Sequence, residues 1–299
     1  MQDDSYFGVI YTLDEGDDPW AEDSWRKANP NYGVSIYPES LRSEAARAQV
    51  MPSMQAAFFT KHLDLWVNAD VTWLPHGAWA RCKAPGLSIE DFAGEPCFIG
   101  VDLALSNDVA AVVILFPPHA ERDWYACFGR YYLPSDTIQK PQNGHFQAWE
   151  TEGLLIATPG AVTDFDYILE DILDVAERFE VQEIVSDPWK NLPLVNALQK
   201  AGFPRPIVNL RCNASNMTPS MLGLEGLVTG QKIRHDGDPI LDWMVGNVVC
   251  HRSGRDGTMQ PRKADDADKI DGAVALMLAV NRAQRFAEAD NGVLVWGSN

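Results

Sequence analysis

Apolar residues in the middle of the chain follow the pattern of β-strands. Three mostly apolar runs, residues 97–105, 109–116 and 124–133, are separated by short polar or proline-containing segments. Runs of this length bounded by turn residues are typical of strands, and short connections favour antiparallel pairing. The sequence therefore predicts a three-stranded antiparallel meander over residues 97–133.

The second half of the chain alternates helical and strand patterns. Apolar positions at helical spacing predict an amphipathic helix over about residues 165–179, capped by Thr163 and Asp164. Short strands at 183–187 and 206–210 flank a helix at about 191–201. Further helices are predicted at about 215–231, 239–251 and 269–287, with a turn-rich ribbon around residues 254–257. This order predicts an α/β domain with a mixed sheet flanked by helices.

The first 90 residues have a different character. They are rich in tryptophan, proline and asparagine, and apolar residues between Pro38 and Leu65 recur at helical spacing. A linker is expected at residues 83–86, which include Pro85 and Gly86. We therefore expect an α-rich accessory segment over residues 1–90 and the α/β domain over residues 91–299.

Composition excludes several classes of protein. The chain has 299 residues, of which 46% are hydrophobic, enough to form a core. It contains no apolar run of about 18 residues, and Met1 is followed by acidic and polar residues, so a membrane span and a secretory signal are not expected. Five widely spaced cysteines without a C-x-x-C pair argue against a disulfide framework or a thiolate zinc site. An intracellular protein with reduced cysteines is expected.

The net charge of −18 opposes binding to nucleic acid unless positive charge is gathered locally. Basic residues are concentrated between residues 199 and 270. One hypothesis is that the ribbon between His251 and Lys263 lies along DNA and contacts its phosphates; the alternative is a solvated, charge-balanced surface. The residues expected to contact DNA are Arg252, Arg255, Arg262, Lys263 and Lys269.

Acidic residues stand where buried strands and the last helix begin or end. Asp102 lies in an apolar strand and Asp187 closes another, where an ionised carboxylate is costly unless it is paired or binds a cation. Asp271 opens the last helix, with Asp268 just before it; the helix dipole alone would favour acids there. Asp108 follows Asp102 across a turn and is either an ordinary turn aspartate or an auxiliary ligand.

Several carboxylates that converge at a sheet edge suit hard divalent ions, chiefly Mg²⁺ or Mn²⁺. Two such ions, about 4 Å apart, can activate a water and neutralise the leaving oxygen of a phosphodiester. This chemistry needs no catalytic serine or histidine. The sequence has no G-x-S-x-G elbow, and His235 and His251 are expected at the surface or against DNA.

Three motifs together resemble the nuclease domain of the large terminase subunit of tailed bacteriophages. They are Gly100-Val101-Asp102-Leu103-Ala104 with Asp108, Ser186-Asp187-Pro188-Trp189, and Lys269-Ile270-Asp271-Gly272-Ala273-Val274-Ala275-Leu276, in that order. Residues 25–33, and Leu65-Trp66-Val67 with Trp73, look like the segment that joins the ATPase and nuclease parts of these proteins. The resemblance covers most of the chain.

The resemblance implies an RNase H-like fold and metal-dependent cleavage of concatemeric viral DNA during genome packaging in the host cytoplasm. It implies double-stranded DNA, the portal protein and the small terminase subunit as partners, and no membrane. By the same resemblance Asp102, Asp187 and Asp271 would be the catalytic metal-binding triad, with two ions of Mg²⁺ or Mn²⁺, and Asp108 an accessory ligand. Asp268 competes with Asp271 for the third place.

One feature of large terminases is missing, and two other functions remain open. The packaging ATPase needs a phosphate loop ending in Gly-Lys, and this chain has no Gly-Lys pair, so we expect it to be the C-terminal portion of such a protein. The first hairpin also resembles that of actin-like sugar kinases, although their second aspartate hairpin has no counterpart here. The remaining alternative is a non-catalytic module that docks a packaging motor.

Overall fold

The computed structural model describes residues 8–14, 16–65, 70–75, 77–189, 191–253, 257–263, 265 and 268–290. The chain forms two compact units, Met1–Pro75 with Val249–Thr258, and His76–Val248 with Met259–Asn299. Residues 77–90 therefore belong to the second unit. The segment expected to be a linker is packed there, because the Ala84 N–H donates to the His235 carbonyl at 2.8 Å.

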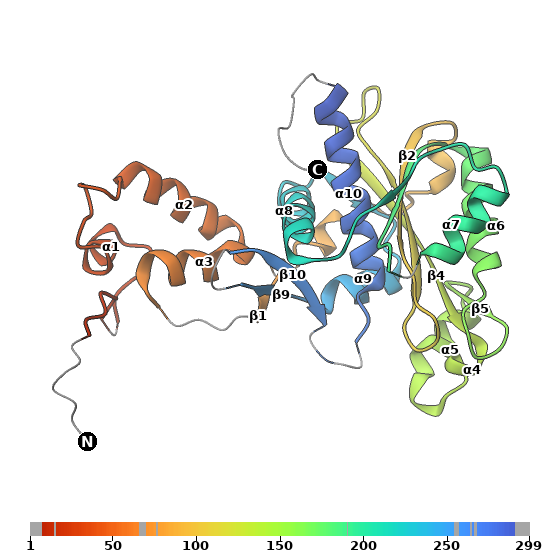
Figure 1. The fold of residues 1–299 in the computed structure, drawn as a ribbon, viewed down its shortest axis with the longest axis horizontal. Helices are drawn as coiled ribbons and strands as arrows, with labels where there is room; N and C mark the ends of the chain where they lie inside the picture. The colour runs from red at the N-terminus through yellow and green to blue at the C-terminus, as the bar shows by residue number, and fades with distance from the viewer. Residues whose placement is uncertain are drawn as a thin grey trace. The chain divides into compact units, whose positions relative to one another are not determined.

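The first unit is built mainly of helices, as its pattern predicts (Figure 1). They are α1 (Glu22–Ala28), α2 (Pro38–Val50) and α3 (Pro52–Leu63), and strand β1 (Asp70–Thr72) pairs antiparallel with β9 (Val248–Arg252). α2 and α3 each begin with proline, whose fixed φ suits the first helical turn. The apolar faces of α1, α2 and α3 enclose a core that includes Trp25, Leu41, Phe58 and Leu63.

The second unit has a central mixed sheet. Strands β2 (Pro96–Asp102), β3 (Ala110–Phe116) and β4 (Tyr125–Pro134) form the predicted antiparallel meander. β6 (Glu180–Ser186) lies parallel to β2, and β7 (Ile207–Asn209) lies parallel to β6. At the other side β4 pairs in parallel with β5 (Leu155–Thr158) and with β8 (Ile233–His235). The main strand order is β5-β4-β3-β2-β6-β7.

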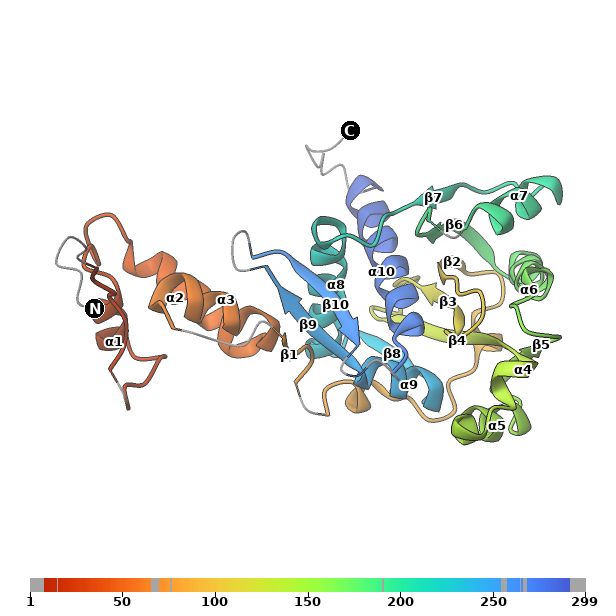
Figure 2. The ribbon, with the colours of Figure 1, turned by 60° about the horizontal axis from the view of Figure 1, so that its bottom comes forward.

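Helices cover both faces of this sheet (Figure 2). α6 (Phe165–Arg178) and α7 (Leu192–Lys200) pack on one face. α10 (Asp271–Asp290) crosses β2 and β3 on the other face and contacts α8 (Ala214–Thr229) and α9 (Pro239–Gly246). β10 (Met259–Lys263) packs on α8, while α4 (Ser135–Ile138) and α5 (Gly144–Thr151) follow β4. Short 3₁₀ turns occupy Ala80–Cys82, Ile89–Phe92 and Pro141–Asn143.

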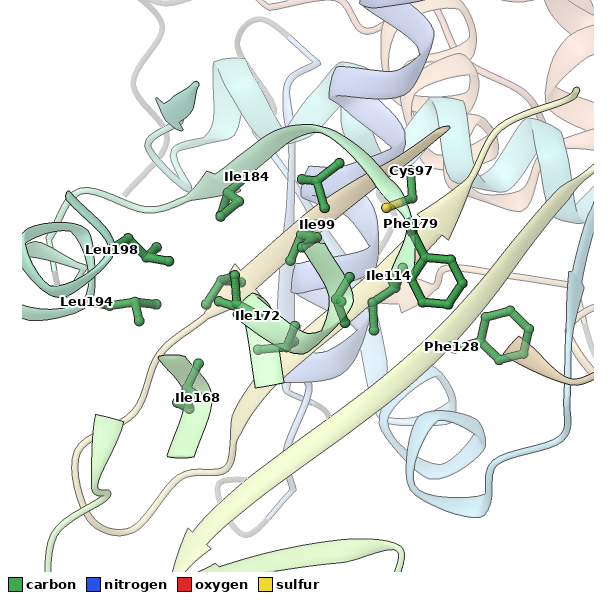
Figure 3. Packing of buried hydrophobic residues seen from close by; sticks show 14 of the residues in the cluster. Cys97, Ile99, Ile114, Phe128, Ile168, Ile172, Phe179, Ile184, Leu194 and Leu198 are labelled. Carbon is green, nitrogen blue, oxygen red and sulfur yellow. The ribbon is translucent and has the colours of Figure 1, made fainter. Parts of the chain in front are cut away.

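The face beneath α6 and α7 is a closed apolar core (Figure 3). Alternate residues of β2, including Cys97 and Ile99, belong to this core together with Ile168 and Ile172 of α6, and all four side chains are fully buried. The Asp164 side chain caps α6 by accepting a hydrogen bond from the Asp166 N–H at 3.0 Å. This core anchors β2 and β6, the two strands that end at the acidic residues.

The opposite face of β2 lies unusually close to α10. A Cβ atom at Gly100 would lie 1.9 Å from the carbonyl oxygen of Ala275, so only glycine permits this contact. Asp102 follows Gly100 by two residues and shares its face, because side chains alternate along a strand. Asp271 precedes Ala275 by about one helical turn. The close approach at Gly100 thus brings the start of α10 beside the end of β2.

Some predicted elements are corrected by the structure. The helix expected over about 239–251 ends at Gly246, and residues 248–252 form β9. The β-branched pair Val248-Val249 suits a strand, and Val249 pairs with Thr72 of β1, a partner that local pattern does not reveal. The short strands β5 and β8 were not predicted. No helix of the described chain is both long enough and apolar enough to span a bilayer.

Candidate active site

The register of β2 and β6 places two aspartates next to each other. In this parallel pair Val101 lies opposite Ser186, so Asp102 and Asp187 are the next residues along the two strands. The carboxyl ends of adjacent parallel strands meet at one edge of a sheet. The two acids therefore reach the same edge, as the sequence predicts.

Four of the five acids predicted to form the site line one cavity of about 360 Å³. They come from β2 and the turn after it, from the end of β6, and from the first turn of α10: Asp102, Asp108, Asp187 and Asp271. The wall is completed by apolar, polar and basic residues: Leu103, Ser186, Trp189, Cys212, Gln260, Pro261, Lys263, Ile270 and Val274. The lining does not include Asp268.

Two backbone groups hold the Asp187 carboxylate. Its Oδ1 accepts a hydrogen bond from the N–H of Trp189 at 2.8 Å, and its Oδ2 accepts one from the N–H of Cys212 at 2.6 Å. Each carboxylate oxygen has two acceptor sites, so both can still contact a cation. The orientation of this side chain is thus fixed before any ligand arrives.

The Asp271 carboxylate is only partly compensated by its surroundings. Its side chain is buried, with the residue only 7% exposed, and within the described part of the chain its Oδ2 has no hydrogen-bond partner. Burial, and secondarily the negative charge of Asp108, raise the pKa of Asp271 to about 6. A buried carboxylate in this situation gains strongly from a neighbouring cation.

Asp108 has two lysine partners. Its Oδ1 accepts hydrogen bonds from the Nζ atoms of Lys263 at 2.9 Å and Lys269 at 2.6 Å. Burial alone would raise the pKa of Asp108, but the two ammonium groups outweigh it and lower that pKa. Lys263 and Lys269, expected to contact DNA, are therefore placed at the acidic cavity. Sequence reasoning missed this pairing because the partners are separated by more than 150 residues.

The other predicted residues lie in different surroundings. Asp268 lies in the turn before α10, where its Oδ2 accepts a hydrogen bond from the Asp265 N–H at 3.1 Å. Arg262 is exposed, whereas Arg252 is buried, with 8% of its surface exposed. Arg255 lies outside the described residues.

His235 corrects the expectation of a surface or DNA-facing histidine. It is fully buried and stacks on Trp79, with ring centroids 4.2 Å apart and an interplanar angle of 11°. Its Nε2 lies 3.1 Å from the Trp79 carbonyl oxygen. These contacts give His235 a structural role at the edge of β8, away from solvent.

The donor set of the cavity fits a hard divalent cation. All four acids offer carboxylate oxygens, the ligands that Mg²⁺ and Mn²⁺ prefer, and the ammonium groups beside Asp108 show that positive charge is stabilised there. Among the described residues, however, no three His, Cys, Asp or Glu side chains are already grouped closely enough to hold a metal ion. The four carboxylates line one cavity, but no three of them are close enough to hold one ion in this arrangement.

The fold and the acid-lined cavity define an RNase H-like α/β domain, and comparison with known proteins identifies its family. The chain matches the family described as terminase large subunit, endonuclease domain, over residues 1–287. Protein YmfN of Escherichia coli (strain K12) is 35% identical over 300 residues, which cover 97% of this chain and 66% of the relative. The large terminase subunit of Enterobacteria phage HK97 is 25% identical over 277 residues, covering 92% and 54%.

A solved structure shares the fold. The crystal structure of the HK97 bacteriophage large terminase superposes with a TM-score of 0.63 at 23% identity, covering 91% of this chain and 56% of that one. The chain belongs to the family of terminase large subunit endonuclease domains. The predicted RNase H-like class and the predicted family are thereby confirmed. The chain spans about half to two thirds of the length of these relatives.

Proposed function

We propose that this chain is a divalent-metal-dependent DNA endonuclease that hydrolyses phosphodiester bonds with two metal ions. One observation carries the proposal: acids from β2, its following turn, β6 and α10 line a single cavity. Membership in the terminase endonuclease family supports the same reaction. The Asp271 carboxylate, whose buried Oδ2 has no hydrogen-bond partner among the described residues, would gain strongly from a cation.

Asp102, Asp187 and Asp271 would hold the ions, which we take to be Mg²⁺ or Mn²⁺. When bound, such ions supply activation of a water and neutralisation of the leaving oxygen. Asp187 contributes a carboxylate whose direction is set by two backbone N–H groups. We assign the third position to Asp271 rather than Asp268, because Asp271 lines the cavity and Asp268 is engaged in the preceding turn.

Asp108 is proposed as an accessory acid that organises positive charge. It holds the ammonium groups of Lys263 and Lys269 beside the other carboxylates. These cations would reduce the repulsion between the acidic cavity and an approaching phosphate. Arg262, which is exposed two residues after Gln260 of the cavity wall, remains a candidate for contact with the DNA backbone.

The biological substrate proposed is concatemeric double-stranded viral DNA, cut during genome packaging in the host cytoplasm. The portal protein and the small terminase subunit are the proposed partners, and residues 1–90 would contribute the segment that joins an ATPase part to the nuclease. A net charge of −18 makes independent binding to DNA weak. Delivery of DNA by the rest of a packaging motor would raise its effective concentration at the cavity.

A plasmid-cleavage assay tests this proposal. The purified chain is incubated with supercoiled DNA in Mn²⁺ or Mg²⁺, with and without chelator, beside Asp102→Asn and the matched variant Asp268→Asn. Loss of a metal ligand should reduce the cleavage rate at least about 100-fold, since bound metal supplies several kcal/mol of transition-state stabilisation. Asp268→Asn should cleave at close to the original rate.

Either of two results contradicts the proposal. Cleavage that survives Asp102→Asn or the chelator would show that the acids do not act through a metal. No cleavage by the unsubstituted chain at any metal concentration would favour the docking module of a packaging motor instead.

A further inference from the structure

Trp189 is a large apolar residue that is almost fully exposed to solvent. The residue is 88% exposed, the highest fraction among the large hydrophobic residues of the described chain that point to solvent. Its backbone is nevertheless anchored, because its N–H donates to Asp187 Oδ1 at 2.8 Å. An exposed apolar ring on a fixed support is typical of a binding surface.

A second cavity adjoins the acidic one at this tryptophan. It has a volume of about 460 Å³ and is lined by Asp187, Pro188, Trp189, Arg211, Cys212 and Asn213. Three of these residues, Asp187, Trp189 and Cys212, also line the acidic cavity. A ligand in the second cavity would therefore lie directly beside the carboxylates. In the sequence Trp189 is noticed only as the last residue of the motif Ser186-Asp187-Pro188-Trp189, and that motif does not reveal the cavity.

The second cavity has groups that attract anions, whereas the first is lined by four acids. Arg211 is exposed, and across the described residues no carboxylate forms a salt bridge with it. The cavity also lies at the N-terminus of the 16-residue helix α8, whose cap is Asn213. A guanidinium group and a helix N-terminus both attract anions, and an indole ring offers a flat face for stacking. Together they suit a phosphate joined to a planar base.

We propose that this cavity is a nucleotide subsite, in which Trp189 stacks on a base of the DNA strand being cut and Arg211 binds the adjoining phosphate. The proposal rests on the nuclease function proposed above and adds the residues that position its substrate. Trp189 is a substrate-contacting residue and takes no part in the hydrolysis. The shared wall at Asp187 places the bound nucleotide next to the phosphodiester at the acidic cavity.

Binding measured without metal separates this subsite from the hydrolysis. Fluorescence anisotropy of labelled DNA in chelator compares the full chain with Trp189→Ala, Trp189→Phe and Arg211→Gln. Loss of one stacked base should weaken binding about 5- to 100-fold, and phenylalanine should restore most of it. Arg211→Gln should weaken binding and reduce the slope of its salt dependence by about one.

Two matched variants control for general effects. Tyr167→Ala removes an exposed ring from α6, on the opposite face of the sheet, and Arg285→Gln removes an exposed cation from α10. Neither should change binding. As a direct readout, 5-iodouracil placed at successive positions of the DNA should cross-link to Trp189 at only one or two positions, identified by mass spectrometry.

The outcomes separate the two proposals. If the chain does not cleave DNA but Trp189→Ala weakens binding and abolishes the cross-link, the nuclease proposal fails and the subsite stands. Normal metal-dependent cleavage with unchanged binding by Trp189→Ala, and no cross-link to Trp189, would overturn the subsite alone and assign the exposed ring to a protein contact. Failure of the unsubstituted chain to bind DNA would also overturn it.

Discussion

The two faces of strand β2 have opposite properties. On one face Cys97, Ile99 and Val101 are fully buried in the apolar core beneath α6 and α7. On the other face Gly100 lets α10 come close, and Asp102 lines an acidic cavity. Because side chains alternate along the strand, one face of β2 stabilises the fold and the other carries an acid of the candidate site. The apolar face secures the strand, so the acidic face can retain a buried carboxylate, Asp271, that lacks full compensation.

The largest effect on stability is expected on the apolar face. Ile172→Ala leaves a cavity beneath α6 and should lower the free energy of unfolding by about 2–5 kcal/mol. Glu170→Ala, on the exposed side of the same helix, should change it by less than about 0.5 kcal/mol. Denaturant titration measures both. An equal loss in the two variants would show that the face beneath α6 is not the anchor described here.

A slightly smaller loss of stability is expected at Gly100, where β2 packs against α10. Gly100→Ala forces a methyl group against the backbone of α10 and should cost about 2–3 kcal/mol. Because α10 carries Asp271, the variant should also lose most DNA cleavage at temperatures where it remains folded. Gly144→Ala, where an added Cβ meets no atom within 4 Å, is the matched control. Full cleavage by Gly100→Ala would show that the contact between Gly100 and α10 does not position the site.

On the acidic face a substitution should stabilise the protein. The pKa of Asp271 is raised to about 6, above its unfolded value near 3.8, so its charge costs stability above about pH 6 and nothing below about pH 4. Asp271→Asn should therefore raise the free energy of unfolding by on the order of 1–3 kcal/mol at pH 7.5, with the gain disappearing near pH 4. Thermal unfolding as a function of pH measures this difference.

Metal provides a second test of the same residue. Mg²⁺ or Mn²⁺ should raise the melting temperature of the unsubstituted chain, because a ligand that binds only the folded state stabilises it. The same ions should have little effect on Asp271→Asn. If Asp271→Asn instead destabilises the protein at pH 7.5, its carboxylate is already compensated and the proposed contrast between the faces is lost.

The smallest effect is expected at Asp108. Its pKa is lowered by Lys269 and Lys263 against the effect of burial, so its charge stabilises the fold above its unfolded pKa and this contribution is lost as the pH falls through the lowered pKa. Asp108→Asn should cost about 0.5–1 kcal/mol at pH 7, since the side chain is 37% exposed and solvent screens the pair. High salt should reduce the difference, and an unchanged difference in 1 M salt would contradict it.

Much of this site could be predicted from the sequence, because the signals are local. Asp102 interrupts an apolar run and Asp187 ends another, so each stands out without knowledge of the fold. The parallel register of β2 and β6 then brings them together. The choice between Asp268 and Asp271 was left open by the sequence, since it depends on where α10 begins and what its first turn faces.

The remaining features depend on contacts between distant segments. The pairing of Lys263 and Lys269 with Asp108 joins the last third of the chain to the first hairpin of the sheet. The burial of His235 depends on stacking against Trp79. The sequence predicts a helix through residues 248–251, but these residues lie in β9 and pair with β1, which is distant in the sequence. Local patterns carry no information about such partners.

The proposed function requires that four separate segments bring their carboxylates to one cation-binding cavity. Crystals of the chain soaked in Mn²⁺, with anomalous diffraction recorded at the manganese edge, test it directly. We expect anomalous peaks about 2.0–2.4 Å from carboxylate oxygens of Asp102, Asp187 and Asp271. Saturating Mn²⁺ that gives no peak in this cavity, or a peak held by Asp268 instead of Asp271, would contradict it.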